Sequence, residues 1–184
     1  MESVYGLILA LFLIVCAFSA GCIGDDTPAP GPGGESIRQP GVLIQTTGDV
    51  TGQGFIPQGV PHSIIDTITF TLGLAPDVQS VDLNKMTIVY ADAVRSEVLI
   101  PVEGYRGDPP PGYWGIIDTL NQVGNPNMRL EFNERFVIRI NPKAPVVPNQ
   151  VITLSVKPNE GKPMILRCMA PSTITENNNI LPVL

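Results

Sequence analysis

The sequence is poor in charge, and this shortage narrows the range of its partners. Asp, Glu, Lys and Arg make up 15% of the 184 residues, against about 25% in ordinary soluble domains. The 11 Lys and Arg are outnumbered by 17 Asp and Glu, which gives a net charge of −6. An acidic chain without a basic cluster argues against nucleic acid as a partner and against charge-driven docking on an anionic membrane.

Residues that carry catalysis or bind metal are also scarce. The single histidine, His62, sits in a Pro-His-Ser turn, and no second His or Cys lies nearby to complete a zinc site. No G-x-S-x-G elbow supports a Ser-His-Asp triad. The glycine-rich run 48–54 lacks both the Lys-Ser/Thr pair of a P-loop and the G-x-G-x-x-G of a dinucleotide site. It therefore predicts a turn between strands.

We accordingly expect no catalytic residue, no metal site, no cofactor and no small-molecule substrate, so the protein is predicted not to be an enzyme. One alternative stays open, a calcium site built from loop carboxylates. The acids considered for it are scattered over strand ends, where solvation is the favoured interpretation: Asp66, Asp77, Asp82, Asp92 and Glu97.

Long apolar runs are absent except for one, Val4–Ile23, which holds twenty residues without a charge. As a helix it would be about 30 Å long, enough to cross the hydrocarbon core of a bilayer. We expect residues 1–23 to form a hydrophobic helix that serves as a filament core, a membrane span or a lipoprotein signal. Its assembly or membrane-embedded residues are predicted to be Leu7, Ile8, Leu9, Leu11, Phe12, Leu13, Ile14 and Val15.

The end of this run supports the lipoprotein alternative. Ser19-Ala20-Gly21-Cys22 resembles a lipobox, which makes Cys22 a candidate lipidation site. Residues 24–41 follow and are rich in proline and glycine, so they predict an exposed linker. Of the three cysteines only Cys168 falls beyond the linker, so no disulfide can form within the remaining domain, residues 42–184.

That domain contains only strand patterns. The clearest is 63–74, where Ile68, Phe70, Leu72 and Leu74 alternate with threonines. Further strands are expected at 42–46, 86–92, 94–102, 113–120, 136–140, 151–156 and 164–169. No helical period follows residue 23. The predicted fold class is all-β, an antiparallel β-sandwich or Greek-key barrel preceded by one N-terminal hydrophobic α-helix.

Three segments of the domain resemble the globular β domain of archaellins, the subunits of the archaeal motility filament. The first has Ala75-Pro76, then Asp82-Leu83, then Thr87-Ile88-Val89-Tyr90. The second and third carry the remaining matches: Leu130, Glu131, Glu134, Phe136, Lys157, Pro158, Gly161, Leu166, Arg167 and Pro171. Together the three segments cover roughly residues 42–171.

The resemblance implies a structural subunit of an extracellular, cell-surface filament for motility or adhesion. Its hydrophobic helix would lie in the core of a helical homopolymer, with the β domain outside. The N-terminal run departs from the family, because Ile8 stands where an early glutamate is usual. The alternative is a lipid-anchored or membrane-tethered surface protein that uses an archaellin-like β domain as a binding or spacer module.

Overall fold

The structure is a computed structural model that describes residues 41–59, 63–102 and 107–184. These residues form strands and no helix, which confirms the all-β part of the prediction. The predicted helix over 1–23 and nearly all of the linker lie outside the described residues. The strands are β1 (Ile44–Thr46), β2 (Thr51–Phe55), β3 (Ile64–Leu74), β4 (Ser80–Asp82), β5 (Thr87–Ala91), β6 (Ser96–Pro101), β7 (Tyr113–Leu120), β8 (Arg129–Glu131), β9 (Arg135–Asn141), β10 (Val151–Lys157), β11 (Met164–Met169) and β12 (Asn178–Ile180).

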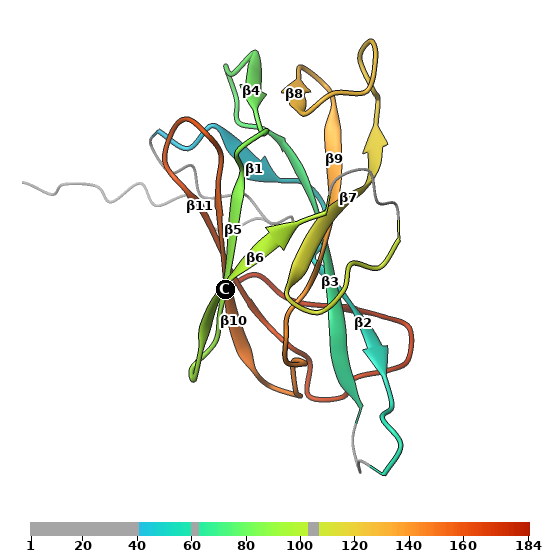
Figure 1. Ribbon diagram of the computed structural model, residues 1–184. Helices are drawn as coiled ribbons and strands as arrows, with labels where there is room; N and C mark the ends of the chain where they lie inside the picture. The colour runs from blue at the N-terminus through green and yellow to red at the C-terminus, as the bar shows by residue number, and fades with distance from the viewer. Residues whose placement is uncertain (1–40, 60–62, 103–106) are drawn as a thin grey trace, which may run out of the picture. The chain divides into compact units, whose positions relative to one another are not determined.

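Ten of these strands form one curled, mixed sheet in the order β11-β10-β5-β6-β7-β9-β3-β2-β12, with β1 on β3 (Figure 1). The expected purely antiparallel sandwich or barrel is wrong at one place, because β6 and β7 run parallel and pair Ile100 with Tyr113. Strand alternation does not encode the direction of a neighbour, so the sequence pattern could not reveal this pair. A separate two-stranded sheet joins β4 and β8.

The core strand of the sheet is β3, which pairs with β1, β2 and β9. Ile68, Phe70 and Leu72 are buried as the alternation predicts. Ile65 is also buried, although it lies an odd number of residues from Ile68. The register shifts there, since Gln53 pairs with Thr67 and Gly54 pairs with Ile65. This β-bulge reverses the phase of the strand and turns Ile65 inward.

The predicted turn at 48–54 is wrong over most of its length, because β2 occupies Thr51–Phe55. Its glycines serve close packing rather than turn geometry. A Cβ on Gly54 would stand 1.8 Å from the carbonyl oxygen of Thr175, and one on Gly52 would stand 2.7 Å from the Ile65 side chain. Only glycine lets the two backbones approach this closely.

The C-terminal segment covers both edges of the long sheet. β12 pairs with β2, which would otherwise end the sheet on that side. Two residues later the same segment reaches β11 at the other edge, where Met169 N donates to Pro182 O (3.1 Å) and Leu184 N donates to Arg167 O (2.9 Å). Curling of the sheet therefore brings its two edges close enough for one short segment to satisfy both.

Candidate functional site

The residues predicted for lipidation and for helix assembly, Cys22 and the set Leu7, Ile8, Leu9, Leu11, Phe12, Leu13, Ile14 and Val15, lie outside the described residues, as does His62. They stay predictions. The carboxylates considered for calcium do not gather. Among residues 41–59, 63–102 and 107–184, no cluster of three or more His, Cys, Asp or Glu could hold a metal ion. The same ranges contain no helix that is long and apolar enough to cross a membrane.

One of those carboxylates, Asp92, has a different role. It follows β5 and lies in the tight turn to β6, and its side chain is only 1% exposed. Its Oδ1 accepts hydrogen bonds from the backbone N–H groups of Val94 (2.8 Å) and Arg95 (3.0 Å). An aspartate that bonds its own turn in this way fixes the turn locally. The exposed tip residue Val94 is thereby held in one backbone conformation.

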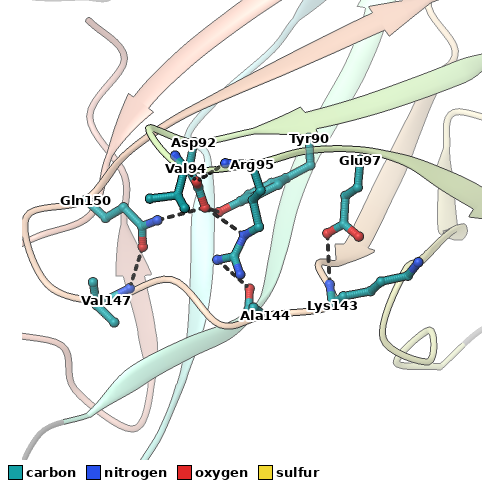
Figure 2. Close-up of polar contacts among 9 residues, drawn as sticks. All are labelled: Tyr90, Asp92, Val94, Arg95, Glu97, Lys143, Ala144, Val147 and Gln150. Carbon is teal, nitrogen blue, oxygen red and sulfur yellow. Dashed lines mark hydrogen bonds and ion pairs between the residues drawn. The ribbon is translucent and has the colours of Figure 1, made fainter.

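The second oxygen of Asp92 connects this turn to a distant loop. Oδ2 accepts a hydrogen bond from Gln150 Nε2 (2.9 Å), and Gln150 Oε1 accepts one from the backbone N–H of Val147 (2.9 Å) (Figure 2). Arg95 Nε lies 2.8 Å from Oδ2 as an ion pair, without the alignment of a hydrogen bond. The loop 142–150 is therefore tied to the β5–β6 turn through one carboxylate.

The pKa values of Asp92 and Tyr90 shift in opposite directions. Burial by itself would raise the pKa of Asp92, but the N–H groups of Val94 and Arg95 and the Arg95 charge together hold that pKa below its usual value. Burial and the neighbouring Asp92 carboxylate raise the pKa of Tyr90 to about 12. The cluster is thus a stable ionised carboxylate beside a neutral phenol, which suits a structural role rather than proton transfer.

Two further contacts complete this end of the domain. Arg95 donates to Ala144 O at 3.5 Å, and Glu97 accepts a hydrogen bond from the backbone N–H of Lys143 (2.9 Å) (Figure 2). Val94 is 93% exposed and Val147 is also exposed. We call these two side chains the valine cap. Fixed backbones on both sides present two apolar side chains to solvent.

Glu134 joins a second pair of turns, because its carboxylate accepts hydrogen bonds from backbone N–H groups in both, as the Asp92 carboxylate does in its own turn. It is 5% exposed and stands directly before β9. Its carboxylate accepts from the backbone N–H of Val123 (Oε1, 3.4 Å) and of Glu131 (Oε2, 3.1 Å). Asn121 Nδ2 also donates to Asn133 O (3.3 Å). The turn after β7 is therefore tied to the turn between β8 and β9.

These joined turns also expose apolar side chains. Phe132 is 63% exposed, and Val123, in the other turn of the bonded pair, is also exposed. We call these two side chains the phenylalanine cap. A single exposed apolar residue needs no explanation, whereas a large contiguous apolar patch marks a contact surface.

The two caps belong to opposite ends of one strand, β9. Glu134 precedes its first residue, Arg135, while the segment that contains Ala144 and Val147 follows its last residue, Asn141. A strand of this length spans about 20 Å. The caps are thus two separate surfaces on one domain, and both offer apolar contact area rather than reactive groups.

Sequence reasoning did not find the caps. It placed Asp92 at a strand end and matched Glu134 to the family pattern, but it gave neither a partner. A local signal existed for Asp92, since an aspartate directly after a strand often accepts hydrogen bonds from the backbone of its own turn. The contact between Asp92 and Gln150 spans 58 residues and has no signal in the sequence.

No protein-family model and no curated protein matches this chain. Its fold does resemble solved structures. The archaeal flagellin FlaB1 from Methanocaldococcus jannaschii is similar with a TM-score of 0.57 and 15% identity, over 75% of this chain and 95% of that chain. The archaeal flagellum of Methanospirillum hungatei is similar with a TM-score of 0.51 and 14% identity, over 75% of this chain and 70% of that one.

The archaellum periplasmic stator complex of FlaF and FlaG from Sulfolobus acidocaldarius reaches a TM-score of 0.48 at 13% identity, over 76% of this chain and 99% of that one. At these identities the two flagellin structures inform on the fold alone. They agree with the three sequence segments that resemble archaellins, and the described part of this chain is therefore an archaellin-like β domain.

Proposed function

We propose that this chain is a structural, non-enzymatic subunit of an archaellin-type surface filament. Its apolar segment, residues 4–23, packs in the filament core, and the β domain forms the outer layer of a helical homopolymer on the cell surface. The observation that carries the proposal is the archaellin-like fold of the β domain. Two of the solved structures with a similar fold are an archaeal flagellin and an archaeal flagellum.

The two caps support the same function. A subunit that polymerises needs contact surfaces that are rigid, apolar and different from each other, because heterologous contacts propagate without closing. Both caps are apolar and their turns are fixed by Asp92 and Glu134. Neither cap carries the groups of a catalytic site.

A second function is favoured by one feature of the sequence. Ala20-Gly21-Cys22, followed by the proline and glycine linker, fits a lipid-anchored surface protein that uses the β domain as a spacer or binding module. In that case the chain would be held at the membrane by Cys22 and would not polymerise.

Intact mass and electron microscopy of cells that produce the chain distinguish the two functions. A filament subunit retains its apolar segment, and its peptides are found in sheared surface filaments. A diacyl adduct on Cys22, with residues 1–21 lost, would contradict the filament. Cys22→Ala should then abolish both the diacyl adduct and the loss of residues 1–21, whereas the matched variant Cys16→Ala should keep both.

A further inference from the structure

Four neighbouring strands share an outer face that is largely apolar. β11, β10, β5 and β6 lie side by side, and every second residue of each strand points away from the core (Figure 1). The strand register aligns Val98 with Val89, Val89 with Ser155, and Ser155 with Ile165. One row across the face thus holds three apolar side chains and a hydroxyl.

The charges on this face are all positive. Lys157 and Arg167 are exposed, and within the described residues neither forms an ion pair. The other outward positions of the four strands are apolar residues, threonines and serines, and none is an acid. We call this surface the cationic face, and its exposed members are Val98, Ile100, Ile165, Met169, Lys157 and Arg167.

The acids in the adjoining segments do not cancel these two cations. Asp92 and Glu97 alternate to the other side of the sheet, where both are hydrogen-bonded. Glu160 stands in the turn after β10, and Lys162 is exposed in the same turn. The cationic face therefore keeps a positive potential.

The outer face of β2 and β12, which pair with each other, carries the opposite charge. Exposed Asp49 precedes β2, and exposed Glu176 precedes β12. Gln53 donates to the carbonyl oxygen of Glu176, so Glu176 lies beside β2. Between these acids Phe55 is 51% exposed and Ile180 is 58% exposed. We call these four exposed side chains the acidic face.

No cation stands close to the acidic face. Residues 41–59 and 168–184, which supply β2, β12 and their flanks, contain no Lys or Arg. The first cation across the sheet is Arg139 on β9, on the far side of β3, and it is already paired with Asp108. Asp49 and Glu176 form no ion pair within the described residues. The acidic face therefore has a negative potential.

From this charge complementarity we infer that the cationic face of one copy docks on the acidic face of the next copy. Lys157 and Arg167 then meet the two free acids, and the exposed apolar side chains of the two faces pack against each other. This inference rests on the proposed function, because in a homopolymer every subunit presents both faces to its neighbours at high local concentration.

The two faces lie at opposite ends of the strand order, with β11 and β5 on the left of Figure 1 and β2 on the right. A contact between unlike faces is heterologous and propagates from copy to copy. Four strands of about six residues cover roughly 400 Å², which is half of the roughly 800 Å² per partner in a stable complex. The contact therefore adds to subunits that are already held together elsewhere, and it aligns their β domains.

Thiol cross-linking in the full-length chain tests this contact. Copies with Val98→Cys and copies with Ile180→Cys, carrying different tags, are mixed under assembly conditions and treated with a short bismaleimide. Peptide mapping measures the link between positions 98 and 180. The matched control is Val94→Cys, at an exposed valine in the β5–β6 turn outside both faces. In a second series Arg167→Glu is added to the Val98→Cys copy, and then Glu176→Arg to the Ile180→Cys copy.

We expect about tenfold more linkage from position 98 to position 180 than from position 94 to position 180, because a held contact raises the effective concentration of the two thiols. Arg167→Glu should lower the 98–180 linkage about threefold, and Glu176→Arg on the other copy should restore it, since the exchanged charges attract again. A variant that merely failed to fold could not be rescued in this way.

Equal linkage from positions 94 and 98, or a loss that Glu176→Arg does not restore, would overturn the inference. Filaments that form without a 98–180 link would leave the proposed function intact and the contact between the two faces wrong. A 98–180 link in a chain that forms no filaments would do the reverse.

Discussion

The carboxylate of Asp92 lies 2.9 Å from the amide Nε2 of Gln150, a residue 58 positions later, and so joins the β5–β6 turn to the loop before β10. We expect Asp92→Asn to lower the free energy of unfolding by about 1–3 kcal/mol. The substitution removes the ion pair with Arg95 and replaces one acceptor oxygen by an N–H₂ group, which cannot accept a hydrogen bond. Urea denaturation measures the change. Asp118→Asn, at an exposed aspartate, should leave the denaturation midpoint nearly unchanged. An equal loss of stability in both variants would show that the contacts of Asp92 contribute nothing.

Glu134→Gln should loosen the phenylalanine cap. The amide keeps one acceptor oxygen, so the N–H of either Val123 or Glu131 loses its bond, at a cost of about 1–3 kcal/mol. Hydrogen exchange of these two amides should speed up more than exchange in the β10–β11 pair. The control is Glu131→Gln, whose side chain accepts no hydrogen bond in these turns. Unchanged exchange in the Glu134 variant would contradict the assigned role.

Tyr90 makes stability depend on alkaline pH. Its pKa is about 12 in the folded chain and 10 in the unfolded one, so between these values only the unfolded chain loses the proton. The contribution of Tyr90 to stability is therefore fully present below pH 10, and the free energy of unfolding falls by about 2–3 kcal/mol as the pH rises to 12. Cys168, whose pKa burial raises to about 11, acts in the same direction.

Comparison with Tyr90→Phe isolates the tyrosine. This variant keeps the ring and loses the titrating group, so its denaturation midpoint should fall less between pH 10 and 12 than that of the native sequence. The contribution of Cys168 is common to both chains and cancels. Parallel curves for the two chains would rule out a contribution from Tyr90.

Gly54→Ala should be strongly destabilising, because the added Cβ would meet the Thr175 carbonyl oxygen at 1.8 Å. Neither backbone can move without breaking β2 pairing, so we expect a loss of about 3 kcal/mol or more. Gly48→Ala is the matched control. No atom lies within 4 Å of its Cβ, and only its φ of +78° opposes the change, at about 1–2 kcal/mol. Thermal unfolding ranks the two; equal losses would mean that the close approach is not a constraint.

Most of the long strands could be predicted from the sequence, because alternation of burial is a local property. The pattern of Ile68, Phe70 and Leu72 fixes one face of β3, and the burial of all three side chains confirms it. The three segments that resemble archaellins also predicted the fold that the solved structures show. The short strands β4, β8 and β12 were missed, since three residues carry too little pattern to stand out.

By itself the sequence determined the all-β class, the boundaries of the long strands and the shortage of catalytic groups, since each of these depends on residue type and near neighbours. Only the tertiary structure decided the parallel pairing of β6 with β7, the covering of both sheet edges by the C-terminal segment, and the two caps. These features depend on contacts between residues far apart in the chain. Asp92 and Gln150 acquire a shared role only when curling of the sheet brings the β5–β6 turn against the loop that follows β9.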